Sequence, residues 1–165
     1  AYAKSKAEEY SVEKICEFIV EDINQSVRVE RDYDIVILGA VGDVLGNSIV
    51  TILKLKSTIK KRGYIIIDDA YSGEGSEERY PSKKQWHQVF QQTGVKLIAE
   101  KAINDFELVK INRINQAHIV RRANELKILY PEQMNIFEGY IRSQQAECEE
   151  LESEITGVTW LLQVI

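Results

Sequence analysis

The residues of this chain that could do chemistry are acids and small residues that follow two apolar runs. Asp68 and Asp69 come directly after residues 64–67, and the Gly-Ala-Val-Gly segment 39–42 comes directly after residues 33–38. Both runs are rich in β-branched residues, which is typical of strands with both faces covered. Because open α/β sheets bind ligands at the carboxyl ends of their strands, we expect a site where these residues meet.

A helix is predicted between these two strands, from about residue 47 to residue 61. Its apolar face consists of Ile49, Ile52, Leu53 and Ile59. The basic residues 60–62 suit the C-terminal end of a helix dipole, and Gly63 is a typical stop signal. Residues 33–71 are therefore predicted to form one strand-helix-strand unit.

Further elements flank this unit. Residues 1–10 favour a helix, and residues 14–20 are predicted to form a strand that leads into Asp22. Ser82 suits the cap of a helix that runs to about Thr93, with Gly94 as its stop, and residues 95–103 follow as a strand. The last strand, residues 157–165, places Val158, Trp160, Leu162 and Val164 on one face. Residues 73–78 form a glycine- and acid-rich loop, either a lid or a plain solvent loop.

A long helical hairpin is predicted from residues 105–130 and 131–155, because apolar residues recur at helical spacing and Pro131 suits a first helical turn. The stripe of the second helix comprises Met134, Phe137, Ile141, Cys148, Leu151 and Ile155. One interpretation is a structural hairpin that packs on itself or on a neighbour. The other is a cap over a substrate pocket, with Arg122 and Tyr140 as contacts.

In this order, residues 33–71, the next helix and the last strand resemble the carboxyl-terminal half of a class I S-adenosylmethionine-dependent methyltransferase. In that family the fourth strand ends in small residues, the next helix closes on a basic, glycine-containing turn, and acids stand at the tip of the fifth strand. Here the turn is Lys61-Arg62-Gly63-Tyr64, so one glycine of the usual pair is replaced.

The resemblance implies an α/β fold: an incomplete Rossmann-like methyltransferase sheet, mostly parallel, whose antiparallel last strand inserts between the fifth and sixth. Residues 1–104 and 156–165 would form this partial domain, and residues 105–155 the inserted hairpin, as a cap or a dimerisation element.

The resemblance also implies S-adenosylmethionine as the cofactor of the intact protein. Asp22 would accept the adenine amino proton, Ile23 would pack on the ring, and Gly39, Ala40 and Val41 would lie against the cofactor. Tyr71 would contact the substrate together with the two hairpin residues. The spacing alone favours a strand terminus and turn for Glu21 and Asp22, and it is the resemblance that favours the role in binding adenine.

The family's glycine-rich cofactor loop and its second-strand acid are not found in this sequence, which begins at Ala1. We therefore expect a carboxyl-terminal piece that does not turn over by itself. Losing two strands would leave open sheet edges, so residues 1–30 should pair with the strand at residues 33–38, swap into a partner molecule or pack irregularly. A homodimer through these edges or through the hairpin is a further expectation.

Composition excludes several other classes of function. The formal net charge of -5 argues against binding nucleic acid through phosphates. No apolar run approaches a membrane span and no signal peptide opens the chain, so we expect a cytoplasmic protein. Cys16 and Cys148 are expected to be reduced and partly buried, with no disulfide. No metal is expected either, because Gly39 stands where metal-dependent catechol-type relatives have an acid.

The predicted function is methyl transfer to a small molecule by the intact protein, largely through alignment and desolvation. The catalytic residue is unknown, and Asp69 is only a weak candidate for a base. A non-catalytic scaffold or dimerisation module is the first alternative. A dinucleotide-binding dehydrogenase is the second, although it should present a glycine fingerprint that this sequence lacks.

Overall fold

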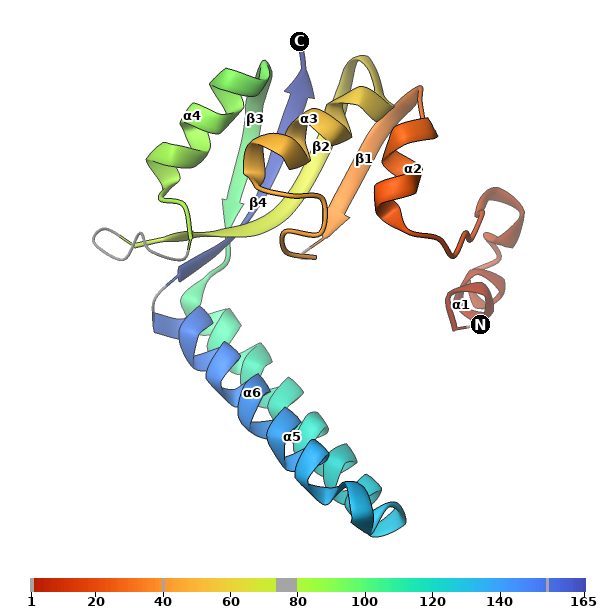
Figure 1. Cartoon of the computed structure of the whole chain (residues 1–165), viewed down its shortest axis with the longest axis vertical. Coiled ribbons are helices and arrows are strands. Elements are labelled where there is room, and N and C mark those ends of the chain that lie inside the picture. Colours follow the sequence, from red (N-terminus) through yellow and green to blue (C-terminus); the bar gives the residue numbers. More distant parts are fainter. Residues whose placement is uncertain (1, 40, 74–79, 154) are drawn as a thin grey trace.

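An open four-stranded sheet forms the body of the computed structural model, which describes residues 2–39, 41–73, 80–153 and 155–165 (Figure 1). The strands are β1 (Tyr33–Gly39), β2 (Ile59–Ser72), β3 (Val95–Ala102) and β4 (Ile155–Val164), in the order β1-β2-β4-β3. Strands β1 and β2 are parallel, and β4 runs antiparallel to both β2 and β3. The predicted insertion of an antiparallel last strand is confirmed.

Six α-helices accompany the sheet within the described residues. They are α1 (Tyr2–Glu9), α2 (Ile23–Val29), α3 (Ser48–Thr58), α4 (Lys83–Thr93), α5 (Asp105–Leu129) and α6 (Met134–Ser153), with short 3-10 helices at Glu13–Ile15 and Pro131–Gln133. Helices α3 and α4 pack on one face of the sheet, and α2 packs on α3 (Figure 1). Helices α5 and α6 form a hairpin that projects away from the sheet.

The core lies between the sheet and helices α3 and α4. Alternate residues of β4 are buried there, as the pattern of the last strand predicted. The indole of Trp160 lies at the centre, with ring centroids 4.6 Å from Trp86 and 5.5 Å from Phe90. Burying rings of this size helps to hold α4 against the strands.

Both predicted ends of helix α4 are confirmed. The hydroxyl of Ser82 accepts a hydrogen bond from the Gln85 amide, while the Gln85 side chain accepts one from the Ser82 amide. Gly94 ends the helix at a φ of +65°, a left-handed conformation that glycine adopts without a steric penalty.

The predicted end of helix α3 is wrong. The helix stops at Thr58, and the basic residues 60–62 already belong to strand β2, where Lys60 forms an ion pair with Asp34 at 3.0 Å. Gly63 is needed for strand packing rather than as a helix stop, since a Cβ there would lie 2.8 Å from the Asp34 carbonyl oxygen. The strand register also shifts here. Tyr33 pairs with Ile59 and Ile35 pairs with Tyr64, so β2 has more residues than β1 between these two pairings.

The inner face of α3 also differs from the prediction. Ile52 and Leu55 are buried, whereas Ile49 and Leu53 are exposed. The helix is rotated so that Thr51 and Thr58 join Ile52 and Leu55 on the side that faces the sheet.

The predicted strand at residues 14–20 is wrong as well. A 3-10 helix occupies Glu13–Ile15, the next residues form no strand, and Cys16 is exposed rather than partly buried. A strand needs a neighbour for its backbone groups, and no described residue before Tyr33 pairs with β1. Of the three arrangements expected for residues 1–30, the structure has irregular packing.

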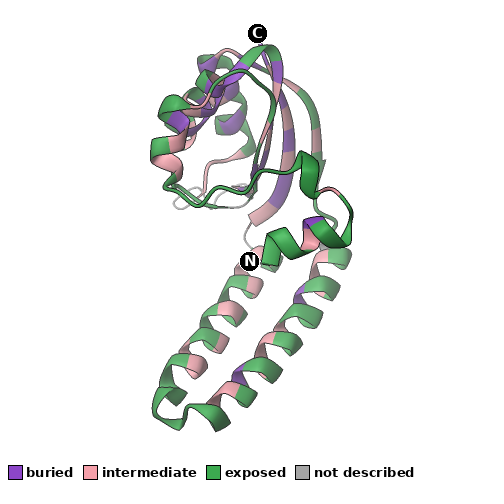
Figure 2. Cartoon of the chain, turned by 90° about the vertical axis from the view of Figure 1, so that its right-hand side faces the viewer, coloured by how far each residue is buried: buried purple, intermediate pink, exposed green. Residues whose placement is uncertain are grey.

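The opposite face of the sheet carries no helix layer within the described residues (Figure 2). Ile35 and Ile37 of β1 point to that face and are 53% and 67% exposed. In the described ranges, none of the helices combines the length and apolar character that crossing a membrane requires.

Candidate functional site

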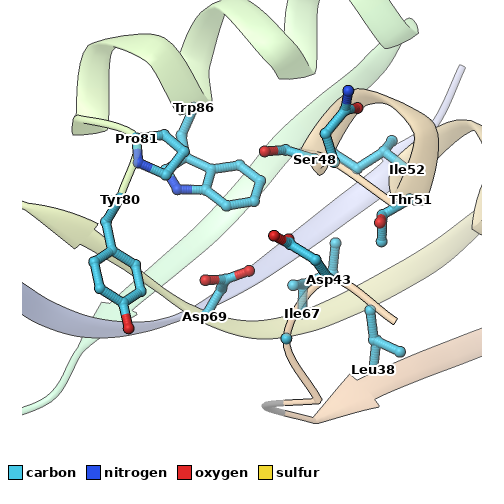
Figure 3. Close-up of a pocket in the computed structure, with 12 residues that line it drawn as sticks. Leu38, Asp43, Ser48, Thr51, Ile52, Ile67, Asp69, Tyr80, Pro81 and Trp86 are labelled. Carbon is cyan, nitrogen blue, oxygen red and sulfur yellow. The ribbon is translucent and has the colours of Figure 1, made fainter. Parts of the chain in front are cut away.

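A cavity of about 430 Å³ lies at the carboxyl ends of β1 and β2, where the sequence predicted a binding site (Figure 3). Its apolar part is formed by Leu38 of β1, Ile52 of α3 and Ile67 of β2. Two carboxylates, those of Asp43 and Asp69, belong to its polar part. The cavity is therefore a mixed pocket with an apolar floor and acidic groups at one side.

The adjacent acids Asp68 and Asp69 face opposite sides of the sheet, because successive strand residues alternate. Asp68 accepts a hydrogen bond of 2.6 Å from the hydroxyl of Thr159 on β4. Asp69 is on the same side as Ile67 and enters the cavity, where its carboxylate accepts a 2.7 Å hydrogen bond from the Ala70 amide. The two acids therefore do not act as a pair.

The pKa of Asp69 is raised above its ordinary value. Desolvation of the carboxylate is the main cause, and the nearby Asp43 carboxylate adds to it, while the hydrogen bond from Ala70 works in the other direction. The nearby charge of Asp43 therefore disfavours the charged form of the Asp69 carboxylate.

Asp43 is held in place by the loop between β1 and α3. Leu45, two residues further on, is almost completely buried, and its carbonyl accepts a 2.8 Å hydrogen bond from the Lys54 amine. Asn47 caps α3 by accepting a hydrogen bond from the Val50 amide at 3.0 Å. An anchored loop can present a carboxylate in a defined direction.

The aromatic wall of the cavity comes from the segment that enters α4. The Trp86 indole donates a 3.0 Å hydrogen bond to the Ala70 carbonyl, which fixes the ring over the end of β2. Tyr80 and Pro81 also line the cavity. The hydroxyl of Ser72 donates to the Tyr80 carbonyl, and its amide donates to the Pro81 carbonyl, so this segment is tied to the strand.

The described residues of the predicted cofactor set do not line this cavity, but they lie in or next to the segments that border it. Asp22 caps α2, its Oδ1 accepting a 2.9 Å hydrogen bond from the Asn24 amide. The Asn24 side chain donates to the Val44 carbonyl at 3.0 Å, which ties the start of α2 to the loop that follows Gly39. Ile23 is half-buried against the core, Val41 is exposed, and Ala40 lies outside the described residues.

Comparison with solved structures gives close matches to this fold. A SAM-dependent methyltransferase from Geobacter sulfurreducens, in complex with S-adenosyl-L-homocysteine, matches 99% of this chain and 70% of its own, with a TM-score of 0.79 and 14% identity. A SAM-dependent methyltransferase from Thiobacillus denitrificans, with the same ligand, matches 99% and 70%, with a TM-score of 0.75 and 12% identity. The chain has the fold of the class I SAM-dependent methyltransferases.

YjhP from E. coli is similar too, with a TM-score of 0.77 and 12% identity over 99% of this chain and 71% of its own. This chain thus spans about 70% of the length of each of these structures. No family model matches the sequence, and no curated protein matches it.

The residues present fit one edge of the nucleoside that this methyltransferase fold binds. Asp22 Oδ2 has no hydrogen-bond partner among the described residues and is exposed, so it can accept from an exocyclic amine. Gly39, at the end of β1, presents no side chain that would obstruct a ligand. Contacts to the rest of the cofactor are not supplied by the elements described above.

The three predicted substrate residues are not brought to the cavity. Tyr71 lies beside Lys83, whose amine is 5.7 Å from the ring centroid, and borders a separate hollow with Ser82 and His87. A hydrogen bond with Glu100 raises the pKa of this lysine. Residues 74–79 of the predicted loop lie outside the described residues.

The two hairpin residues do not border this cavity, and their predicted contact with a substrate stays a prediction. Arg122 is exposed on α5, where it forms an ion pair with Glu125 at 2.8 Å, and Tyr140 is exposed on α6. The hairpin leaves the sheet next to β4 and runs away from it, so these side chains do not line the cavity (Figure 1).

The sequence did not identify every residue that lines the cavity. Asp43 and Trp86 were missed as site residues, and so were the polar residues Ser48 and Thr51. A usable signal was present in α3, since Ser48, Thr51 and Leu55 share the spacing of one helical face. Among the described residues, no group of three His, Cys, Asp or Glu side chains could hold a metal ion.

Proposed function

We propose that this chain is the carboxyl-terminal part of an enzyme that transfers a methyl group from S-adenosylmethionine to a small molecule. The observation that carries this proposal is the cavity at the carboxyl ends of β1 and β2, next to the Asp22 and Gly39 edge. The fold supports it, and two of the structures that share the fold hold S-adenosyl-L-homocysteine. We also propose that the protein works in the cytoplasm.

In this proposal Asp22 binds the adenine amine, Ile23 packs against the ring, and residues 39–41 pass under the nucleoside. The cofactor, when bound, supplies an electrophilic methyl group on a sulfonium. The remaining contacts, including a glycine-rich loop, come from a preceding part of the protein. The 165-residue chain alone is therefore expected to show no turnover.

The cavity takes the methyl acceptor. Its apolar floor, formed by Leu38, Ile52 and Ile67, excludes water from the acceptor and positions its carbon skeleton. Asp43 and Asp69 hold the polar end of the acceptor in a defined direction. Alignment and desolvation supply most of the rate in this mechanism.

The test is calorimetric titration of the whole protein with S-adenosylhomocysteine. Asp22→Asn retains a good helix cap but replaces the carboxylate that accepts from adenine, so affinity should fall about tenfold. Glu21→Gln removes the neighbouring exposed charge and should leave affinity unchanged. Absence of binding by the unmodified whole protein would refute the methyltransferase proposal.

A second candidate function is a dimerisation module. The hairpin exposes large apolar side chains on both helices, namely Ile111, Ile114 and Ile128 on α5 and Ile136 and Tyr140 on α6. Such residues are a common feature of self-association surfaces. Light scattering of the chain should then give a dimer mass that Ile114→Glu and Ile136→Glu together convert to a monomer mass, whereas a monomer at all concentrations would reject this function.

A further inference from the structure

We infer that the cavity between β1, β2 and α4 binds a methyl acceptor that carries a positively charged amine, held between Asp43 and Asp69. This inference rests on the proposed function, because it names the chemical class of the acceptor. It makes the protein an amine N-methyltransferase rather than an enzyme that acts on hydroxyls, carboxylates or carbon.

The carboxylates of Asp43 and Asp69 converge on one space in the cavity. Asp43 comes from the loop after β1 and Asp69 from β2, and both point toward the same space near the indole of Trp86 (Figure 3). They are close enough for the charge of Asp43 to raise the pKa of Asp69. Two like charges that share a small space are stabilised when a cation enters it.

The described residues supply no cation at this cavity. None of the described residues that line the cavity is Lys, Arg or His, and neither carboxylate forms an ion pair with a described residue. Desolvating an unpaired carboxylate is unfavourable. An ammonium group on the ligand would offset that cost, whereas a carboxylate or phosphate ligand would increase it.

The N-terminus of α3 also borders the cavity, through Asn47 and Ser48. A helix N-terminus favours negative charge, so among the described parts of the cavity lining it is the feature that could attract an anionic ligand. The Asn47 side chain is already used for the cap, and Asp43, four residues earlier, brings a negative charge of the protein's own to the same cavity wall. The N-terminus of α3 therefore does not need an anionic ligand.

The remaining surfaces suit the rest of such an acceptor. The rings of Tyr80 and Trp86 flank Asp69, and aromatic faces attract ammonium groups (Figure 3). The apolar floor takes the carbon skeleton. An amine on a short apolar body is therefore complementary to the whole cavity.

The reaction balances with these residues. An ammonium acceptor transfers one proton to the carboxylate of Asp69, which leaves a neutral amine with a lone pair. That lone pair would attack the methyl group that the bound cofactor supplies. The N–C bond would form as the C–S bond breaks, and the electron pair of the C–S bond would stay on the sulfur, which becomes a neutral thioether. The methylated ammonium is released, and Asp69 returns its proton to water.

The test compares three probes of the same shape in NMR titrations of the chain, followed at the Trp86 indole N–H: 2-phenylethylamine, 2-phenylethanol and phenylacetate. We expect the amine to bind at least about tenfold more tightly than the alcohol. Phenylacetate should bind more weakly than the alcohol. Equal affinities for the three probes would overturn the inference. Tighter binding of phenylacetate would also overturn it and would point to the N-terminus of α3 as an anion site.

Two variants locate the charge that matters. Asp69→Asn and Asp43→Asn should each weaken amine binding by about tenfold and leave binding of the alcohol unchanged. Asp68→Asn makes the same change one residue away, on the opposite face of the sheet, and should have no effect. An equal loss in Asp68→Asn would mean that general charge, rather than the cavity, attracts the amine.

The failure of this inference can be told apart from the failure of the proposed function. Amine binding is measured on this chain without the cofactor, whereas the proposed function is tested by S-adenosylhomocysteine binding to the whole protein. If the nucleoside binds but the amine does not, the acceptor belongs to another class. If the amine binds but the nucleoside does not, the cavity is an amine site without methyl transfer.

Discussion

The two faces of the sheet carry the same kinds of side chain but differ in what covers them. Ile65 and Ile67 of β2 face helices α3 and α4 and are 0% and 2% exposed, whereas Ile35 and Ile37 of β1 lie on the uncovered side. Strands that are hydrophobic on both faces normally occur in sheets that other elements cover on both sides. The described residues therefore form one complete helix layer and the candidate cavity, and they include no second layer on the other face (Figure 2).

The strongest way to test this comparison is to truncate one large side chain on each face. Trp160→Ala empties the centre of the covered face and should lower the free energy of unfolding by about 3–5 kcal/mol. Ile37→Ala, on the uncovered face, should cost less than about 1 kcal/mol in the same chain. Urea denaturation measures both, and similar losses would mean that the uncovered face is packed in solution.

A smaller effect is expected where β2 meets β1. Gly63→Ala would place a Cβ 2.8 Å from the Asp34 carbonyl oxygen and 2.5 Å from Ile59 Cγ2, so it should destabilise the chain by about 1–3 kcal/mol. Gly139→Ala, in the middle of α6 with open space around it, is the matched control and should stabilise the helix by about 0.5–1 kcal/mol. If both changes are neutral in thermal unfolding, the strand pairing at Gly63 is wrong.

The uncovered face should behave differently in the whole protein. Ile37→Thr should leave the stability of this chain nearly unchanged but cost about 1–2 kcal/mol in the whole protein, where we expect a second layer to bury it. Denaturant unfolding of both forms measures the difference. Equal effects in the two would show that nothing packs on this face.

The smallest expected effect comes from the cavity on the covered side. Since the pKa of Asp69 is raised from 3.8, the folded chain holds its proton to higher pH than the unfolded chain. Stability should therefore decrease as pH rises from the unfolded pKa through the folded pKa, and stay lower above it. Asp69→Asn should abolish this dependence and raise Tm near neutral pH by at most about 4 °C. Differential scanning calorimetry from pH 3 to pH 8 measures the Tm and its pH dependence. If Asp69→Asn has the same pH profile of Tm as the unmodified chain, the Asp69 carboxylate is not desolvated.

Features set by local pattern could be predicted from the sequence. The alternation in residues 157–165 gave the buried face of β4, and Ser82 and Gly94 gave both ends of α4, because capping and periodicity depend on nearby residues. The strand order followed from the family resemblance rather than from any pattern.

Features set by distant partners could not be predicted in this way. The run 14–20 has strand composition but no strand to pair with, and Gly63 matches a helix stop although its role is close packing in β2. Asp43 depends on the burial of Leu45, and the direction of the hairpin depends on where α6 meets β4. Neither contact leaves a local signal, which is why Asp43 was missed and why the distance of Arg122 from this cavity could not be predicted.

A crystal structure of the whole protein grown with S-adenosylhomocysteine tests the central claim most directly. We expect the adenine to contact Asp22 and Ile23, the nucleoside to pass over Gly39, and the sulfur to face the cavity that holds Asp43 and Asp69. A nucleoside bound at another edge of the sheet, or density for none under saturating ligand, would contradict the account.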